Sequence, residues 1–212
     1  MTKLIVFGAS GGTGQRLVEQ ALEKEYEVTA FVRQASSFPA PHPRLRLVVG
    51  DVRNPQDVSA ACAEQDAVLS ALGPSAKSEP ICEDGTRAIL AGMQAHGVKR
   101  LVALSAYGAA ESHHGLYSWV TWAMLKTKMQ DKERMETLIR DSLTDWTLVR
   151  PPALTNGAHT GTYQTGLDVP ISLASNISRA DVADFMLREA QACRFLRETP
   201  TITGRRRPGT PP

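Results

Sequence analysis

The chain has 212 residues, of which 42% are hydrophobic and 22% are charged, and this composition fits one globular domain with a full core. A formal net charge of +2 argues against a large nucleic-acid-binding surface. No apolar run has the length of a membrane-spanning helix or the pattern of a signal peptide, and Cys62, Cys82 and Cys193 lack the spacing of metal ligands. We therefore expect a cytoplasmic protein with reduced thiols and without metal, nucleic acid or membrane as a partner.

The first predicted element is a short apolar run from Leu4 to Phe7, which is typical of a buried parallel strand. Glycines follow it at intervals of three residues. Gly8 permits a tight turn, Gly11 lets a pyrophosphate approach the backbone, and Gly14 lets the next helix pack on the strand. The order of strand, glycine turn and helix predicts a dinucleotide-binding site.

The helix that follows begins near Gly12, and apolar residues recur at helical spacing from Gln15 to Lys24. Its N-terminus offers unpaired N–H groups and the positive end of a dipole, which favour a bound phosphate. The hydroxyl groups of Ser10 and Thr13 can add two more donors. We expect the pyrophosphate of the cofactor at this helix end.

A second strand, Glu27 to Val32, ends at Arg33, and no acidic residue follows before Asp51. A carboxylate at this place would bind the ribose 2′-hydroxyl of NAD, whereas an arginine pairs with the 2′-phosphate of NADP. The sequence therefore favours NADP(H) over NAD(H). The alternative is that Arg33 is an ordinary solvated surface residue.

The third strand, Leu45 to Val49, leads to Asp51, which has two interpretations. In a doubly wound sheet its carboxylate can accept a hydrogen bond from the adenine amine. Equally, it can hold the turn into the predicted helix from Pro55 to Ala63. The fourth strand, Ala67 to Ala71, gives way to Leu72 and Gly73, and we expect this loop to pass under the nicotinamide ribose.

A helix from about Pro80 to His96 and a fifth strand from Val98 to Leu104 complete a regular alternation. This pattern predicts a single-domain α/β fold of the Rossmann-like, doubly wound kind, with a parallel sheet and helices on both faces. We expect the domain to span residues 1–203. Residues 204–212, which include Arg205, Arg206 and Arg207, are expected to form a disordered basic and proline-rich tail.

Beyond Leu104 lie the residues from which we expect the acceptor pocket. Ser105, Ala106 and Tyr107 follow the fifth strand, and a helical segment from Gly115 to about Asp141 carries Trp119 and Trp122. Such aromatic side chains either fill the core or form the wall of a pocket for a flat substrate, and both interpretations stay open.

The last third of the chain predicts a sixth strand from Trp146 to Val149 and a short final strand from Thr199 to Thr203. Between them, the polar and glycine-rich stretch from Thr155 to Asp168 predicts a mobile flap over the site. Ser178 to Asp181 forms a capping box that begins a helix ending near Cys193.

These motifs together resemble the atypical short-chain dehydrogenase/reductase superfamily, in the compact NAD(P)-binding branch that includes NmrA-like proteins. Within this branch the chain is most similar to the biliverdin-IXβ reductases, which are also NADPH-dependent flavin reductases. The residues that carry the resemblance keep their order over nearly the whole chain: Phe7 to Gly14, Tyr26 to Thr29, Val32-Arg33, Val49 to Val52, Gln65 to Val68, Ala95 to Val98, Pro151-Pro152, Thr160 to Tyr163 and Asp184 to Arg188.

The resemblance implies hydride transfer from NADPH to flavins or open tetrapyrroles with few catalytic side chains. It implies that Arg33 and Ser36 hold the 2′-phosphate, and it places Ser105 beside the nicotinamide. Where the family commonly has a histidine after the Pro-Pro pair, this chain has Ala153. This departure weighs against tetrapyrrole reduction more than against flavin reduction, because a flavin takes hydride at N5 and collects its proton from solvent.

Taken together, the predictions assign three sets of residues. The cofactor site comprises Gly8, Ser10, Gly11, Gly12, Thr13, Gly14, Arg33, Ser36, Asp51, Val52, Leu72, Gly73, Ser105, Pro151 and Pro152. The substrate pocket comprises Ala106, Tyr107, Trp119, Trp122, Ala153 and Leu154. Ser105 is the one candidate catalytic residue, and its expected role is to orient the carboxamide or donate a hydrogen bond.

The tyrosine–lysine pair of the wider superfamily is absent. Neither Tyr107 nor Tyr117 has a lysine four residues on, and Lys128 stands where the tyrosine partner of Lys132 would belong. We therefore expect a monomeric NADPH-dependent reductase of a small flat acceptor, with flavin first and biliverdin second. The alternatives are a non-catalytic NADP(H) sensor of the NmrA type that acts through a protein partner, and a quinone or aldehyde reductase.

Overall fold

The computed structural model describes residues 2–35, 41–73, 80–112 and 115–205. Its centre is a six-stranded parallel sheet in the order β3-β2-β1-β4-β5-β6. Short, mostly apolar runs form these strands: β1 (Lys3–Phe7), β2 (Glu27–Val32), β3 (Leu45–Val49), β4 (Ala67–Ser70), β5 (Arg100–Leu104) and β6 (Asp145–Val149). The order reverses beside β1, which pairs with both β2 and β4. The predicted doubly wound α/β fold is confirmed.

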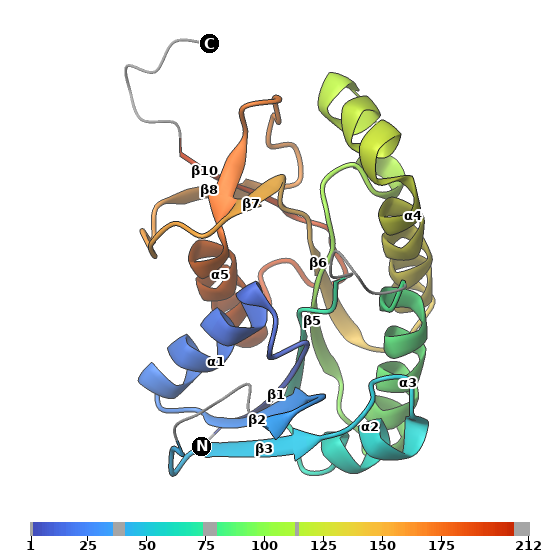
Figure 1. The fold of residues 1–212 in the computed structure, drawn as a ribbon, viewed down its shortest axis with the longest axis vertical. Coiled ribbons are helices and arrows are strands. Elements are labelled where there is room, and N and C mark those ends of the chain that lie inside the picture. Colours follow the sequence, from blue (N-terminus) through green and yellow to red (C-terminus); the bar gives the residue numbers. More distant parts are fainter. Residues whose placement is uncertain (1, 36–40, 74–79, 113–114, 206–212) are drawn as a thin grey trace.

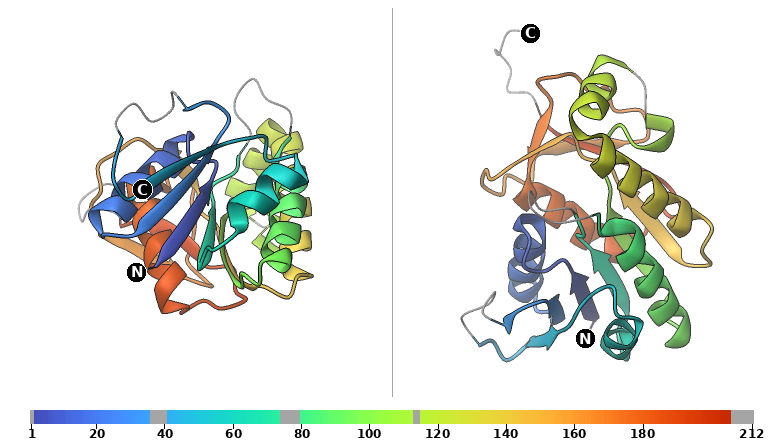
Figure 2. Two further views of the ribbon diagram at one scale, coloured as in Figure 1. Left: turned by 90° about the horizontal axis from the view of Figure 1, so that it is seen from below. Right: turned by 45° about the vertical axis from the view of Figure 1, so that its right-hand side comes forward.

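Helices cover both faces of this sheet (Figure 1). On one side α1 (Gly12–Glu23) packs against α5 (Arg179–Ala192). On the other side α2 (Pro55–Cys62), α3 (Cys82–Ala95) and α4 (Gly115–Arg140) form a second layer, and the view from below separates the two layers clearly (Figure 2). Each layer buries its own apolar cluster against the sheet, so both faces of the sheet are covered and its carboxyl edge is the place left for a ligand.

Two small sheets lie beyond the end of β6. The strand β7 (Ala153–Thr155) pairs in parallel with β9 (Asn176–Ser178), and β8 (Tyr163–Gly166) pairs antiparallel with β10 (Thr201–Gly204). Sequence patterns did not predict β7, β8 or β9. The predicted last strand is shifted, because Gly204, which we assigned to the tail, ends β10. Residues 206–212 of the predicted tail lie outside the described residues.

The stretch from Thr155 to Asp168, which we predicted as a mobile flap, is tied to α5. The carboxylate of Asp181 accepts hydrogen bonds from the backbone N–H groups of Thr160 and Gly161, at 2.7 and 2.9 Å. The hydroxyl of Tyr163 donates to Asp184 at 2.9 Å. These bonds fix the middle of the stretch on the first turns of α5, whose predicted capping box at Ser178 is present.

The long helix α4 is broken once. Leu125 has φ −129° and ψ 29°, so the helix changes direction there and its first part extends beyond the sheet (Figure 1). This first part exposes large apolar side chains, with Trp119 69% and Met124 76% accessible. None of the helices in the described ranges combines the length and the apolar character that crossing a membrane requires.

Candidate cofactor and acceptor site

The glycine turn after β1 has the geometry that the sequence predicts. Gly8 has φ +74°, and a Cβ atom added there would lie 2.7 Å from the carbonyl oxygen of Ala71. A Cβ atom on Gly14 would lie 2.1 Å from the carbonyl oxygen of Gly8. No side chain caps the N-terminus of α1. The turn therefore brings α1 tightly onto β1 and leaves the helix end open toward the carboxyl edge of the sheet.

A first cavity, of about 220 Å³, lies where the strand order reverses. We call it the nucleotide cavity. Its wall combines the glycine turn with the ends of β2 and β3 and the loop after β4: Gly8, Ser10, Gly11, Phe31, Val32, Arg33, Gly50, Val52, Ala71, Leu72, Gly73 and Ile81. In open α/β sheets, dinucleotides bind in the crevice at the point where the strand order reverses.

Arg33, the residue expected to favour NADP(H) over NAD(H), lies on the wall of the nucleotide cavity and is exposed. Its guanidinium forms no ion pair with any residue in the described part of the chain. Ser36, the second expected ligand of the 2′-phosphate, lies outside the described residues. A free cation at this wall suits a phosphate.

Asp51 holds the turn into α2, as its second interpretation proposed. Its Oδ1 atom accepts a hydrogen bond from the backbone N–H of Arg53 at 2.9 Å, and its backbone carbonyl accepts one from Asn54. Val52, not Asp51, lines the nucleotide cavity. The structure therefore gives the Asp51 carboxylate a structural partner in the turn.

A second cavity, of about 410 Å³, adjoins the same glycine turn and extends across the ends of β4 and β5 to α4 and α5. We call it the acceptor cavity. It is lined by Gly11, Gly12, Thr13, Ala71, Leu72, Gly73, Leu104, Ser105, Ala106, Leu125, Lys128, Met129, Lys132, Leu154 and Arg179. The two linings share Gly11, Ala71, Leu72 and Gly73, so the two cavities adjoin each other and one extended ligand could occupy both.

Lys132 is buried at the floor of the acceptor cavity, and its ammonium group is fully engaged. It donates to the carbonyl oxygens of Leu72 at 2.7 Å and Leu104 at 2.5 Å, and its third contact is the sulfur of Met135 at 3.9 Å. These bonds tie the loop after β4 to the end of β5. Lys132 thereby fixes the backbone on which the nicotinamide ribose is expected to lie.

Ser105 lies at the end of β5 and lines the acceptor cavity, but its hydroxyl proton is already used. It donates to Oε1 of Glu136 at 2.5 Å. Arg150 in turn donates to both oxygens of Glu136, at 3.0 and 2.5 Å. Since a hydroxyl has a single proton, Ser105 can only accept a hydrogen bond from a group in the cavity.

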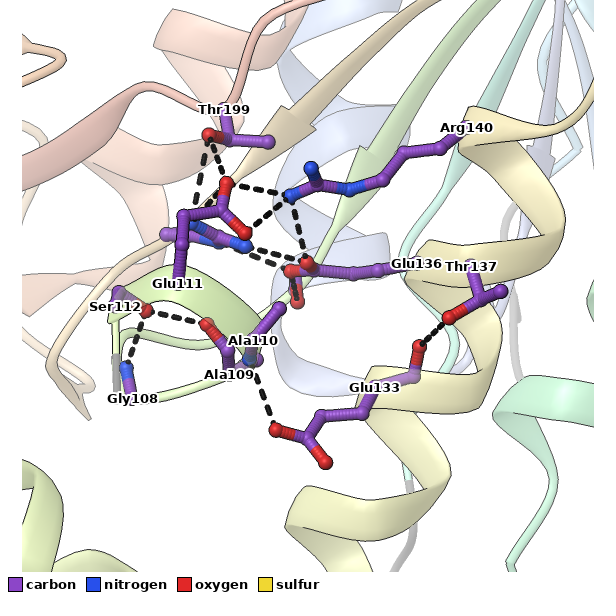
Figure 3. Close-up of polar contacts among 12 residues, drawn as sticks. Gly108, Ala109, Ala110, Glu111, Ser112, Glu133, Glu136, Thr137, Arg140 and Thr199 are labelled. Atoms are coloured by element: carbon purple, nitrogen blue, oxygen red, sulfur yellow. Dashed lines mark hydrogen bonds and ion pairs between the residues drawn. The ribbon is translucent and has the colours of Figure 1, made fainter.

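The pair of Glu136 and Arg150 belongs to a larger charged network that also contains Glu111, Arg140 and Thr199, and Figure 3 shows these three residues around Glu136. Arg140 contacts both Glu136 and Glu111, Arg150 contacts Glu111 at 3.1 Å, and the hydroxyl of Thr199 donates to Glu111 at 3.2 Å. Burial alone would lower the pKa of the Arg150 guanidinium, but its bonds to Glu136 and Glu111 raise it. The network therefore holds the side chain of Glu136 in place behind Ser105.

The expected substrate residues are divided among several places. Ala106 and Leu154 line the acceptor cavity. Tyr107 lines a separate cavity of about 560 Å³ beside the charged network. Trp122 donates its indole N–H to the carbonyl oxygen of Gly108 at 2.8 Å, and Trp119 lies on the exposed first part of α4. Neither tryptophan lines the acceptor cavity.

The residues after β6 lie around the cavity rather than in it. Pro151 and Pro152 are buried, and the carbonyl of Pro151 accepts a hydrogen bond from the backbone of Tyr107 at 2.8 Å. Ala153 is exposed on β7. The Pro-Pro pair thus positions the segment of Tyr107 and Leu154 without lining either cavity.

Sequence patterns missed Arg179, the first residue of α5. Its side chain lies directly against the first turn of α1, since a Cβ atom added to Gly12 would lie 2.7 Å from Arg179 Cδ. Its guanidinium donates to Asn156 Oδ1 at 2.7 Å and lines the acceptor cavity. Only the packing of α5 on α1 brings this cation beside the helix end where a pyrophosphate is expected.

The described walls of both cavities contain cations and no carboxylate. Arg33 lies at the nucleotide cavity, and Lys128, Lys132 and Arg179 lie at the acceptor cavity. Within the described ranges, no three His, Cys, Asp or Glu side chains converge as metal ligands would. The chemistry that these walls favour is the binding of an extended anionic molecule.

Comparison with known proteins agrees with this geometry. Residues 8–192 match the model of a family described as NAD(P)H-binding. A 3-beta-hydroxysteroid dehydrogenase from Mycolicibacterium neoaurum is 34% identical over 113 residues, which cover 47% of this chain and 31% of that protein. The chain thus spans less than a third of the length of this relative.

Two solved structures share the fold over nearly the whole chain. ChuY, an anaerobilin reductase from Escherichia coli O157:H7, has a TM-score of 0.82 at 22% identity, and the match covers 100% of both chains. A short-chain dehydrogenase/reductase from Veillonella parvula, in complex with NADP, has a TM-score of 0.83 at 20% identity, with 99% of this chain and 96% of that chain covered. Both neighbours are less than 25% identical to this chain, so they show its fold, and the family model shows NAD(P)H binding.

Proposed function

Because the chain belongs to the NAD(P)H-binding family, we propose that it is an NADPH-dependent reductase that transfers hydride to a flat, conjugated acceptor. The preferred acceptor is a free flavin, FMN or riboflavin, and biliverdin is the second. The cofactor supplies the hydride at its nicotinamide. The chain holds the phosphates at Arg33 and at the N-terminus of α1 and leaves the acceptor cavity for the oxidant.

The observation that carries this proposal is that the two polar side chains at the end of β5, Ser105 and Lys132, already use their protons within the protein. Ser105 donates to Glu136, and Lys132 donates to two backbone carbonyls. Reduction of a ketone needs a positioned proton donor, which in the wider superfamily is a tyrosine. Flavin reduction needs none, because N5 accepts the hydride and solvent supplies the proton. Proximity of the two rings then provides most of the rate enhancement.

The acceptor is tested by following NADPH consumption with FMN, FAD, riboflavin, biliverdin and a simple quinone. We expect turnover with flavins to exceed turnover with the quinone. Turnover with the quinone alone would instead favour a quinone reductase. Tight binding of NADPH without oxidation by any acceptor would refute the reductase proposal.

The preference for NADPH is attributed to Arg33, and it is tested by exchanging this residue. In an Arg33→Asp variant the carboxylate repels the 2′-phosphate and can bind a 2′-hydroxyl, so kcat/KM with NADPH should fall and that with NADH should rise. Arg53 lies outside the walls of both cavities, and Arg53→Asp is the matched control. An unchanged ratio of NADPH to NADH in Arg33→Asp contradicts the assignment.

One observation favours a second candidate, an NADP(H) sensor that acts through a protein partner. The first part of α4 exposes Leu116, Trp119 and Met124, which are 63%, 69% and 76% accessible, and exposed apolar side chains of this size are typical of interaction surfaces. A sensor would bind NADP+ and NADPH without consuming either. The turnover assay above therefore separates the two candidates.

A further inference from the structure

The expected cofactor leaves one cation in the walls of the two cavities without an assigned role. The 2′-phosphate is assigned to Arg33 on the wall of the nucleotide cavity. The pyrophosphate is assigned to the open end of α1, where Arg179 packs against Gly12. Lys132 is occupied by backbone carbonyls. Lys128 remains without a role.

Lys128 stands on α4, four residues before Lys132, so both side chains lie on the same face of the helix. It is half-buried and lines the acceptor cavity. In the part of the chain that the structure describes, no hydrogen bond or ion pair occupies its ammonium group. An ammonium group in a cavity wall without a partner is available to pair with an anionic group of a ligand.

The other walls define where this anion would lie. Arg179 comes from α5 and Lys128 from α4, and these helices cover opposite faces of the sheet (Figure 1). Apolar side chains stand near Lys128 in the same wall, namely Leu125, Met129 and Leu154. The cavity thus combines an apolar surface for a flat ring with a cation on the α4 side, away from the pyrophosphate end of the site.

We propose that Lys128 selects acceptors that carry an anionic substituent, a carboxylate or a phosphate, over neutral acceptors with the same ring. This inference rests on the proposed reductase function and specifies its substrate class. Lys128 stands at the position of a catalytic tyrosine in the wider superfamily, but here it contacts the substituent of the acceptor rather than the reacting atoms. Its effect therefore appears in acceptor preference and not in the rate of hydride transfer to a neutral ring.

The test uses two pairs of acceptors, and the two members of each pair have the same ring system but differ in their anionic groups. FMN and riboflavin differ by a phosphate, and biliverdin and its dimethyl ester differ by two carboxylates. For the unmodified chain we expect kcat/KM to be about tenfold higher for the charged member, the size of one partly exposed charge-assisted contact. The pair that shows the larger ratio identifies phosphate or carboxylate as the recognised group.

Variants of Lys128 locate the effect. In Lys128→Met the ratio should fall toward one through a higher KM for the charged acceptor, and Lys128→Arg should restore most of it. Lys126→Met is the matched control, because Lys126 is exposed on the same helix and lines neither cavity. The affinity for NADPH, measured by fluorescence titration without acceptor, should not change in any of these variants.

Two results overturn the inference while leaving the reductase proposal intact. One is equal kcat/KM for charged and neutral acceptors in the unmodified chain. The other is a Lys128→Met variant that loses NADPH affinity but keeps its acceptor preference, which would assign Lys128 to the cofactor. Failure of the reductase proposal looks different, since no acceptor of either pair would then oxidise bound NADPH.

Discussion

The hydroxyl of Ser105 illustrates how a neighbouring residue restricts what a site residue can do. Its proton lies in a short bond to Glu136, whose side chain is only 1% accessible and is held by Arg150. The hydroxyl therefore offers only lone pairs to the acceptor cavity, where the N–H group of a nicotinamide carboxamide is a suitable donor. Ser105 is consequently suited to orienting the cofactor and is unsuited to protonating a substrate.

Replacing Ser105 tests this assignment. In Ser105→Ala we expect kcat with FMN to change less than about threefold, with a higher KM for NADPH, since one neutral hydrogen bond is lost. A general acid at this position would instead contribute about 10²–10⁴ to turnover. Steady-state kinetics at saturating NADPH distinguish the two cases, and thermal unfolding verifies that the variant is folded.

Gly14 provides a second test at the residue scale. A Cβ atom there would lie 2.1 Å from the carbonyl oxygen of Gly8, so Gly14→Ala must displace α1 from β1. We expect this variant to lose about 3 kcal/mol or more of unfolding free energy, as in severe overpacking. The control is Gly97→Ala. Gly97 has φ +69° but a Cβ atom there would meet nothing within 4 Å, so only the unfavourable backbone conformation should lower the unfolding free energy, by about 1 kcal/mol. Urea unfolding measures both, and equal losses would contradict the packing argument.

The residues that sequence predicts best are those whose partners are close in the chain. Gly8 and Gly14 belong to one strand–turn–helix unit, and the geometry of that unit follows from local rules. Arg179 and Lys128 could not be assigned in this way, because tertiary packing alone brings α5 and α4 to the glycine turn. Trp119 and Trp122 were placed in the substrate pocket on residue type alone, and the break at Leu125 carries them elsewhere.

At the scale of the element, α3 depends on a residue of another helix for its first turn. Its N-cap residue, Ile81, has no side chain that can accept a hydrogen bond. Asp131 of α4 replaces it, with its carboxylate accepting from the backbone N–H groups of Ile81, Cys82 and Glu83 at 3.1, 2.9 and 2.9 Å. The carboxylate also complements the positive end of the helix dipole. Asp131 thus joins α3 to α4, next to Lys132 and its two bonds to backbone carbonyls.

We expect Asp131→Asn to lower the unfolding free energy by about 1–2 kcal/mol, because the amide NH2 cannot accept a hydrogen bond and at least one charge-assisted bond is lost. Burial alone would raise the pKa of Asp131, but the N–H donors outweigh it and lower the pKa below its usual value. The stabilisation that the ionised Asp131 carboxylate contributes is therefore complete at pH values above the usual pKa of an aspartate, and it is lost as pH falls through the lowered pKa. Urea unfolding at pH 7 and pH 5 should give the same difference from the unmodified chain. A difference that shrinks between these values would contradict the lowered pKa.

The six strands of the main sheet were predictable because each is a short β-branched run between turn residues. The strands β7 and β9 are three residues long and gain their stability from each other, so local pattern does not reveal them. The flap shows the same limit. Its polar and glycine-rich composition predicts mobility, whereas Asp181 and Asp184 on α5 supply hydrogen bonds that composition cannot show.

At the scale of the whole molecule, the charged network joins segments that the sheet alone does not connect. Glu111 lies in the 3-10 turn η2 (Ala110–Ser112), Glu136 and Arg140 lie on α4, Arg150 follows β6, and Thr199 precedes β10. Arg150 and Glu136 are 3% and 1% accessible, so each needs the other as a partner. The network therefore couples the C-terminal small sheet to the wall behind Ser105.

Glu111 makes this coupling dependent on pH. Burial alone would raise its pKa, but hydrogen bonds from Arg150 and Arg140 lower it to about 2, from an ordinary value of 4.5. A lowered pKa means that the ionised form is stabilised by folding, so this contribution is complete above about pH 4.5 and is lost as pH falls toward 2. Because Glu111 is half exposed, solvent screening limits the contribution to about 1 kcal/mol or less.

Glu111→Gln should therefore be less stable than the unmodified chain at pH 7, and the difference should close as pH is lowered from 4.5 toward 2. Glu64→Gln is the control, because Glu64 is 82% accessible and forms a pair of 3.5 Å with Lys3 at the surface. Its effect should be near zero, since screened surface pairs stabilise little. Urea midpoints at pH 7, 4 and 3 decide the outcome. A constant difference for Glu111→Gln over this range would show that its carboxylate does not hold the two arginines, and the small sheet would then be joined to the core by packing alone.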